Sequence, residues 1–376
     1  MNISDLLPEL IRGLAAFTPG NAMMIAVGAL LIYLAVAKEY EPVLLLPIGF
    51  GCVLANIPLT GMTEAGGWLG VLYQVGISTE LFPLLIFVGV GAMIDFSPLL
   101  SQPKMVLLGA AGQFGIFGTL ILATLLGFPL NQAASIGVIG AIDGPTSIFV
   151  ASILAPELLA PIAVAAYSYM SLIPIIQPPL MKLLTTPAER RIRMEYAARP
   201  VSRRALILFP VVVTVVVGLM VPDATPLIAT LMLGNLLRES LVVDRLSKTA
   251  QNELINIATL FLGLTIGSTM NAGAFLNLVT IQVMLLGLLA FVLDTVAGLL
   301  FGKLMAFVTR GGINPLIGAA GISAFPMAGR LAAKVALEED QENFILMHAM
   351  GANTAGQLGS VMAGGILLAL VTGIIG

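Results

Sequence analysis

The sequence predicts an all-α polytopic membrane protein, and its composition, its long apolar segments and one isolated carboxylate lead to this prediction. Of 376 residues, 58% are hydrophobic and 10% are charged, and the mean hydropathy is +1.03. Soluble domains carry about 25% charged residues, so a water-soluble fold is excluded. Asp143 is the only charged residue between Lys104 and Glu157. Intramembrane carboxylates are costly and usually belong to ion or proton paths, which indicates an ion pump or transporter.

The apolar segments define the predicted spans. A helix needs about 20 mainly apolar residues to cross a bilayer. Two semi-apolar segments, 132–154 and 312–332, are interrupted by Gly and Pro. We expect re-entrant hairpins there, because broken backbone at membrane depth is tolerated only where protein surrounds it. The predicted helical spans are 21–37, 42–60, 81–94, 105–128, 158–181, 205–221, 225–240, 257–270, 279–302 and 343–374.

The basic residues predict the orientation. If each hairpin returns to its own side, every Lys and Arg except Arg12 lies on one face, and the positive-inside rule makes this face cytoplasmic. The densest basic run, "AERRIRMEYAARPVSRR", is therefore interpreted as a cytoplasmic linker and not as a nucleic-acid patch. The loops of this face are 38–41, 95–104, 182–204, 238–253, 303–310 and 330–342, and the opposite loops carry only Glu64, Glu80, Glu157 and Asp223.

Two halves of the chain resemble each other. "FVGVGAMIDFSPLL" from Phe87 aligns with "GLTIGSTMNAGAFL" from Gly263, and "IGVIGAIDGP" from Ile136 aligns with "IGAAGISAFP" from Ile317. Each half has an odd number of crossings, so the repeats are inverted, and such repeats place a binding site at the midplane where the two hairpins meet. The predicted parts are an amphipathic surface segment (1–20), the first repeat (21–182), a basic linker (183–204) and the second repeat (205–376).

Asp143 and its neighbours form the first candidate site. Gly144 and Pro145 break the helix and free backbone carbonyls, and Thr146 and Ser147 add hydroxyls. Hard cations such as sodium prefer carboxylate, carbonyl and hydroxyl oxygens. We therefore predict a sodium or proton ligand at Asp143, and the alternative is a carboxylate that is paired within the core or lies at the hairpin mouth.

The last span supplies the second candidate set. Asn353, Thr354, Gln357 and Ser360 are polar and are separated by glycines that include Gly356. Small residues and hydroxyls also serve helix packing in membranes. The combination of Asn and Gln favours an ion path over simple packing.

For four other side chains the sequence is compatible with two roles each. Tyr167 and Tyr169 lie two positions apart and face different ways on a helix, so one can reach a cavity while the other packs. Asp294 is a second intramembrane acid, either a cation site or the partner of a nearby cation. Arg330 either attracts an anionic group such as a carboxylate or sets the orientation. The chain contains no Walker lysine and no credible motif of a soluble enzyme.

Four stretches resemble the β subunits of sodium-translocating biotin-dependent decarboxylases, of the methylmalonyl-CoA, glutaconyl-CoA and oxaloacetate decarboxylase type. They are "GAIDGPTSIFVAS", "AAYSYMSLIPIIQPPLMK", "AAGISAFPMAGR" and "HAMGANTAGQLGS". The resemblance implies a membrane subunit that decarboxylates carboxybiotin on a carrier subunit, pumps sodium outward and consumes a proton. It also implies that the functional residues are Asp143, Tyr169, Asn353, Gly356 and Ser360.

The same resemblance implies the surroundings of the chain. Its partners would be a carboxyltransferase α subunit, a biotin carrier subunit, a small membrane subunit and further copies of itself, in a bacterial cytoplasmic (inner) membrane. The family's basic residue near the C-terminus is missing, because only His348 is basic after Lys334. The rival interpretation is a sodium-coupled secondary transporter of a small carboxylate, which would need more anion-binding groups than Arg330.

Overall fold

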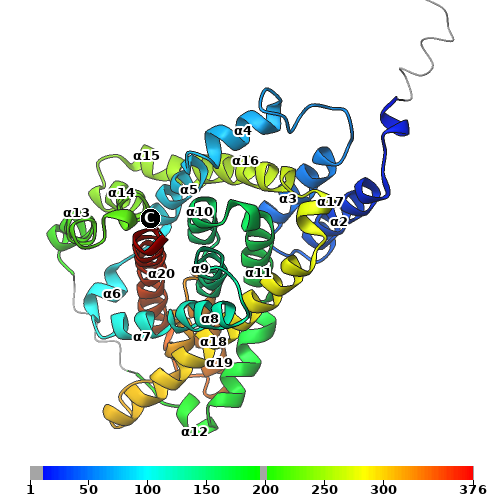
Figure 1. Ribbon diagram of the computed structural model, residues 1–376. Coiled ribbons are helices and arrows are strands. Elements are labelled where there is room, and N and C mark those ends of the chain that lie inside the picture. The colour runs from blue at the N-terminus through cyan, green and yellow to red at the C-terminus, as the bar shows by residue number, and fades with distance from the viewer. Residues whose placement is uncertain (1–11, 195–200, 376) are drawn as a thin grey trace, which may run out of the picture.

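The computed structural model describes residues 12–194 and 201–375, and this part of the chain is helical and contains no strand. Helix α20 (Leu346–Ile375) runs through the middle of the bundle beside α9 (Leu130–Val138) and α10 (Gly144–Leu154) (Figure 1). The predicted surface segment 1–20 lies mostly outside the described residues, and so does part of the linker 183–204.

Six helical stretches of the described residues are long and apolar enough to cross a bilayer. The 26-residue α11 and the 31-residue α18 exceed the requirement of about 20 residues. This finding confirms a polytopic helical membrane protein. The six are α2 (Pro19–Ala37), α7 with α8 (Met105–Ala111 and Phe114–Leu125), α11 (Leu159–Leu184), α13 (Arg203–Met220), α18 (Leu278–Val308) and α20.

Four of the ten predicted spans are short helices. The predicted bounds 81–94, 225–240 and 257–270 agree with the structure to within two residues, whereas the predicted span 42–60 extends past its helix, which ends at Ala55. Helices α3 (Pro42–Ala55), α5 (Leu81–Met93), α14 (Thr225–Ser240) and α16 (Ile255–Ser268) contain only 13 to 16 residues. At 1.5 Å per residue, such helices are shorter than the hydrocarbon core of about 30 Å. They pack in pairs, α3 against α16 and α5 against α14. Hydropathy did not show that α3 ends at Ala55.

The remaining short elements connect these helices. Helix α4 makes a bend of 61° with α5, so the two together could form one broken span. A π-helical turn, Ala250–Leu254, joins α15 to α16 without interruption. The bounds are α4 (Trp68–Gly76), α6 (Ser97–Ser101), α12 (Pro187–Arg190), α15 (Asp244–Thr249), α17 (Ala272–Phe275) and the 3-10 turns Pro156–Leu158 and Pro222–Ala224.

Apolar side chains face outward on the peripheral helices. Only 11% of the spanning window of α13 and 22% of that of α2 are buried inside the protein, compared with 61% for α11. Leu208, Val212 and Val215 of α13 are each more than half exposed. Such surfaces suit a lipid environment, whereas the buried centre of the bundle holds the polar side chains described below.

Both predicted hairpins are interrupted helices whose tips meet. The first consists of α9, a 3-10 turn (Ile139–Ala141) and α10, which matches the prediction of 132–154. The second consists of a 3-10 segment (Pro315–Gly321) and α19 (Met327–Glu339), so its second arm extends beyond the predicted end at residue 332. Ser323 Oγ donates to the Ala141 carbonyl at 2.7 Å, which joins the two tips.

Asp294 of α18 supports another interrupted helix. Helix α8 begins at Phe114, after the break at Gly112 and Gln113, and its first N–H groups have no partner in their own helix. The Gly115 N–H donates to Asp294 Oδ1. No Lys or Arg forms an ion pair with Asp294 among the described residues. The carboxylate therefore acts here as a cap supplied by a neighbouring helix.

We expect Asp294→Ala to lower the stability of the protein by about 1–2 kcal/mol, the usual cost of removing a helix cap. Asp294→Asn keeps an oxygen for the Gly115 N–H and should cost clearly less. Thermal unfolding of the two variants in detergent measures the difference. Equal destabilisation by Asn and Ala would show that the charge and not the hydrogen bond matters at this position.

Candidate functional site

The Asp143 carboxylate is buried at the break of the first hairpin and accepts four hydrogen bonds. Oδ2 accepts from Thr146 Oγ1 (2.7 Å), Gln357 Nε2 (2.8 Å) and Ser360 Oγ (2.8 Å), and Oδ1 accepts from the Thr146 backbone N–H (3.3 Å). Asp143 is 4% exposed. These bonds and the positive end of α10 offset part of the cost of keeping a charge away from water.

The local sequence produces this geometry. Ile142 has a φ of 51°, in the left-handed region, and ends the 3-10 turn, while Asp143 returns to extended backbone as the N-cap of α10. Pro145 in the first turn is compatible with a helix start, because the first N–H groups have no intrahelical partner. The chain therefore reverses its helical path at Asp143 and points this side chain toward α20.

Helix α20 presents its polar residues along one face toward both hairpin tips. Asn353, Gln357 and Ser360 follow one another at helical spacing. Gln357 and Ser360 contact Asp143, whereas Asn353 Nδ2 donates to the Ile322 carbonyl of the second hairpin at 2.7 Å. Asn353 Oδ1 is buried and has no hydrogen-bond partner within the described residues, so it can accept a further ligand.

Gly356 lets α20 approach the second hairpin closely. A Cβ at this position would meet the backbone carbonyls of Gly321 and Ile322, the latter at 2.8 Å. The predicted ion-path residues therefore divide into two groups. Thr146 and Ser360 contact the Asp143 carboxylate, and Asn353 and Gly356 contact the break of the second hairpin.

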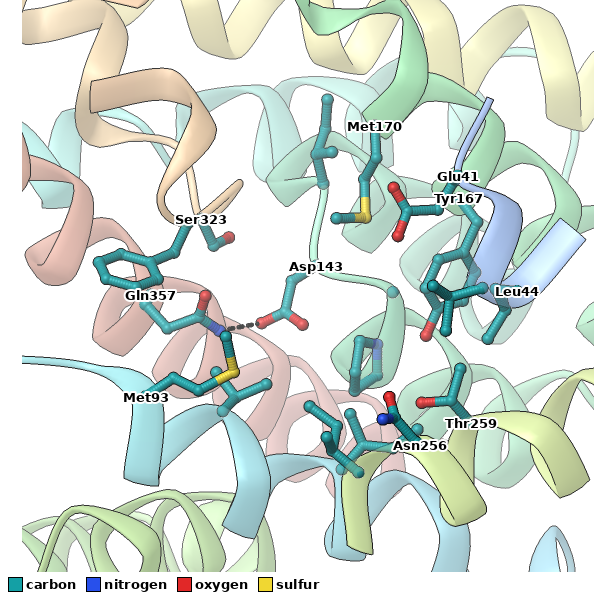
Figure 2. A pocket seen from close by; sticks show the side chains of 18 of the residues that line it. Glu41, Leu44, Met93, Asp143, Tyr167, Met170, Asn256, Thr259, Ser323 and Gln357 are labelled. Carbon is teal, nitrogen blue, oxygen red and sulfur yellow. Dashed lines mark hydrogen bonds between the residues drawn. The ribbon is translucent and has the colours of Figure 1, made fainter. Parts of the chain in front are cut away.

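Asp143 lines a cavity of about 340 Å3. Figure 2 shows the carboxylate between Gln357 on one side and Tyr167 with Glu41 on the other. The other walls come from α3, α5 and α16. The lining includes Glu41, Met93 and Gln251, which lie in or next to the loops 38–41, 95–104 and 238–253 that the sequence predicts on the basic face.

Tyr169 and Arg330, which the sequence predicted as functional and catalytic candidates, lie outside this cavity. The Tyr169 hydroxyl donates to the Met284 carbonyl of α18, and Tyr167 is the tyrosine that reaches the cavity. Arg330 is exposed on α19 and lines a separate shallow hollow with Lys334 and Glu338. The functional roles of Tyr169 and Arg330 stay predictions.

Gln357 was named in the polar series but was not included among the predicted ligands, although it contacts Asp143 directly. The signal was its position three residues before Ser360, which places the two side chains on one helix face. Ser323, the contact between the tips, was also missed. In the repeat alignment Ser323 corresponds to the apolar Ile142 of the first hairpin, so the repeat did not indicate a polar contact at this position.

The oxygens around Asp143 suit a hard monovalent cation. The hydroxyls of Thr146 and Ser360 donate to the carboxylate and keep lone pairs for a cation. Within the described residues, no group of three or more His, Cys, Asp or Glu side chains could hold a multivalent metal. The arrangement fits a sodium ion or a proton as transported substrate. A carboxylate that lines a cavity at a broken hairpin of a helical membrane protein defines the class of the protein as an ion translocator.

Comparisons with known proteins define the family. Residues 20–371 match the family described as Na+-transporting oxaloacetate decarboxylase beta subunit, and the chain belongs to this family. It is 56% identical over 360 residues to the methylmalonyl-CoA decarboxylase subunit beta of Veillonella parvula, a match that covers 96% of this chain and 95% of the relative.

The names of two further relatives refer to the decarboxylation of other compounds. The glutaconyl-CoA decarboxylase subunit beta of Acidaminococcus fermentans is 53% identical over 361 residues, which are 96% of each chain. The oxaloacetate decarboxylase beta chain of Klebsiella pneumoniae is 47% identical over 420 residues, which cover 96% of this chain and 97% of the relative. The family resemblance that the sequence motifs indicated is thereby confirmed.

Proposed function

We propose that this chain is the membrane subunit of a sodium-pumping decarboxylase, which couples decarboxylation of carboxybiotin on a carrier subunit to outward sodium transport. The observation that carries the proposal is the Asp143 carboxylate, held by Thr146, Gln357 and Ser360 at the end of a cavity toward the basic face. The family of the chain and the names of its relatives support the reaction class.

The chemistry requires a proton as well as a sodium ion. The N–CO2 bond of carboxybiotin breaks, CO2 leaves, and the electron pair remains on the ureido nitrogen, which takes up one proton. Asp143 binds sodium from the cytoplasm together with hydroxyls of Thr146 and Ser360. A proton from the outer side then displaces the ion outward and is consumed at the ureido nitrogen. Asn353, with its free Oδ1, extends the sodium path.

The proposed architecture is a pair of inverted repeats. Glycines at two helix crossings support it. A Cβ on Gly51 of α3 would meet the Leu264 carbonyl of α16, and a Cβ on Gly234 of α14 would meet the Val88 carbonyl of α5. Val88 and Leu264 are equivalent in the repeat alignment, so the two crossings involve corresponding positions, as the proposed repeats require.

A second pair of helix contacts also involves positions that correspond in the repeat alignment. A Cβ on Gly91 of α5 would meet the Leu231 carbonyl of α14, and a Cβ on Gly267 of α16 would meet the Ile48 carbonyl of α3. Gly91 and Gly267 are the residues that the sequence alignment pairs. The peripheral contacts are equivalent as well, because α2 packs on α3 and α13 packs on α14. This symmetry supports alternating access around the meeting hairpins.

The proposed partners follow from the family. They are a carboxyltransferase α subunit, a biotin carrier subunit and a small membrane subunit, together with further copies of this chain, in a bacterial inner membrane with the basic face in the cytoplasm. Arg330 and Lys334 lie exposed on α19 at this face. In the proposal, Arg330 attracts the carboxylate of the arriving carboxybiotin, and Tyr169 takes part in proton or sodium transfer from α11.

A sodium-coupled carboxylate transporter is not favoured. Among the described residues that line the Asp143 cavity, none is Lys or Arg. A pocket that binds a carboxylate substrate tightly would be expected to provide a cationic partner or several N–H donors. Arg330, the basic residue that this alternative needs, lies outside the cavity.

Decarboxylation of free carboxybiotin by the purified protein in proteoliposomes tests the function. We expect sodium to stimulate CO2 release at least about tenfold, with sodium accumulating on one side of the membrane. Potassium at the same ionic strength is the control. Sodium-driven uptake of a small carboxylate without CO2 release would overturn the proposal and support the transporter.

A further inference from the structure

We propose that Asp294 is a proton-binding site, which carries a proton on Oδ2 while the first hairpin rests against α18 and exchanges it only when this hairpin moves. Its carboxyl group lies beside Gly140 in the 3-10 turn Ile139–Ala141, and Asp143 follows two residues after this turn. The inference rests on the proposed pumping function, which consumes a proton, and it assigns to Asp294 a proton that is separate from sodium binding at Asp143.

The two oxygens of the Asp294 carboxyl group have different surroundings. Oδ1 accepts the Gly115 N–H, whereas Oδ2 is buried and has no hydrogen-bond partner among the described residues. The whole side chain is buried, and it forms no ion pair with a described Lys or Arg. A buried carboxyl group without a partner for its charge takes up a proton, because the ionised form would lose its hydration without compensation. The proton therefore belongs on Oδ2.

The space around Oδ2 is too small and too apolar for a metal ion. A Cβ on Gly140 would lie 3.1 Å from Oδ2, 2.9 Å from the Ala290 Cβ and 3.3 Å from the backbone carbonyl carbon of Gly115. Carbon atoms in contact are normally about 3.5–4.0 Å apart, so α18, α8 and the turn already touch one another at this point. Sodium would require a shell of oxygen ligands, whereas the Ala290 methyl group lies here. A proton needs no additional space.

The elements that pack on α18 offer no cation to Asp294. Helices α7, α8 and α9 and the 3-10 segments Ile139–Ala141 and Pro315–Gly321 contain no titratable residue. The other titratable side chains belong to α11 and to α18 itself, and the two lysines among them form ion pairs with glutamates elsewhere. These side chains are Tyr167, Tyr169, Lys182 and Lys303. A proton, and not an ammonium or guanidinium group, therefore neutralises the carboxyl group.

The corresponding position of the first repeat carries a hydrogen-bond donor. In the register that pairs Gly140 with Gly321, Asp294 corresponds to Gln113. Gln113 Nε2 donates to the Gly321 carbonyl at 3.4 Å, so each of the two side chains lies against the glycine in the hairpin of the other repeat. A carboxyl oxygen can take the place of an amide N–H donor only when it carries a proton. The comparison of the two positions therefore supports the protonated form of Asp294.

Movement of the first hairpin uncovers this proton. Alternating access moves the hairpins relative to the helices around them, and the turn Ile139–Ala141 is the part of the first hairpin that lies against Oδ2. When water reaches Oδ2, the O–H bond breaks, the electron pair stays on Oδ2 and water accepts the proton. Proton uptake is the reverse of this step. The same movement shifts Asp143, so proton exchange at Asp294 is coupled to sodium transfer.

The test measures the infrared band of a protonated carboxyl group in purified protein at neutral pH, in a detergent without ester groups. We expect the wild type to show this band and Asp294→Asn to lose it. The control is Asp223→Asn, which replaces an exposed acid and should keep the band. After transfer into D2O, the band should shift at least about tenfold faster during turnover with sodium and carboxybiotin than at rest.

Asp294→Asn keeps an oxygen for the Gly115 N–H, so we expect it to fold and to bind 22Na+ normally but to decarboxylate at least about tenfold more slowly. If this variant does not fold, labelling with 13C-aspartate assigns the band in Asp143→Asn protein, where Asp294 is the buried aspartate that remains among the described residues.

A wild type without the band, an Asp294→Asn protein that keeps it, or equal exchange at rest and during turnover would overturn the proposal. The band at rest requires no turnover. Its absence is therefore distinct from a failure of the proposed function, which would appear as the absence of sodium-stimulated CO2 release by the wild type.

Discussion

Asp143→Asn should reduce sodium-dependent decarboxylation at least about 100-fold, or about 2.7 kcal/mol. The substitution keeps the shape of the side chain and removes the charge that binds the cation. It also introduces an N–H2 group into a site where four donors converge, because Thr146, Gln357 and Ser360 all donate to this carboxylate. One of the two amide positions must then face another donor, and that unsatisfied contact adds to the loss.

The control for this variant is Asp223→Asn. Asp223 is an exposed acid in a 3-10 turn outside the Asp143 cavity, and its replacement removes the same formal charge from the protein. The measurements are CO2 release from free carboxybiotin and 22Na+ transport in proteoliposomes at several sodium concentrations. Asp143→Asn protein that folds, inserts and still shows sodium-dependent decarboxylation would remove Asp143 from the mechanism.

The sequence allowed the prediction of Asp143 because the signal is a rare one. A single charge within an apolar stretch of about fifty residues has few explanations in a membrane, and its neighbours Gly144 and Pro145 marked the break. Ser360 and Thr146 were predicted as oxygen donors, and both contact the carboxylate. The meeting of the two hairpins was expected from the repeat and is seen at Ser323 and Ala141.

Other features could not be predicted from residue type and spacing. The spacing of Tyr167 and Tyr169 showed that they face different ways, but it did not show which one faces the cavity. The family resemblance favoured Tyr169, and the structure places Tyr167 beside Asp143 and Tyr169 against α18. Glu41 follows Lys38 and Glu39 in a loop, where acids are common, so its position in the cavity depends on how α3 packs.

The length of α3 was overestimated, because the predicted span 42–60 extends past Ala55, where the helix ends. An apolar stretch satisfies a hydropathy criterion whether or not its last residues are helical. The packing of α3 against α16 and of α5 against α14 is a tertiary contact, and such contacts are not visible in one sequence. Glycines in these helices were the available sequence signal of helix crossings, because close approach of helices in membranes requires small residues.

Gly356→Ala should lower both the stability and the activity of the protein. The added Cβ would meet the backbone carbonyls of Gly321 and Ile322, and backbone atoms cannot turn aside as a flexible side chain can. Overpacking of this kind usually costs about 1–3 kcal/mol. Alanine has the higher helix propensity, by about 1 kcal/mol, so a net loss of stability would arise from the contact with the second hairpin.

Gly373→Ala is the matched control on the same helix. A Cβ at Gly373 meets no atom within 4 Å, so this variant reports the gain in helix propensity without the clash. We expect the thermal unfolding midpoint to fall for Gly356→Ala and to stay level or rise slightly for Gly373→Ala. Equal midpoints for the two variants would mean that α20 and the second hairpin can separate without cost.

The loss of activity in Gly356→Ala should exceed what instability alone explains. Gln357 and Ser360, which contact Asp143, follow within one turn of Gly356, and Asn353 contacts the Ile322 carbonyl beside the clash. Moving α20 away from the second hairpin therefore also alters its hydrogen bonds to the first. We expect at least about tenfold slower sodium-dependent decarboxylation at a temperature where the variant is fully folded. A normal rate under that condition would show that the contact between α20 and the second hairpin stabilises the fold without positioning the sodium ligands.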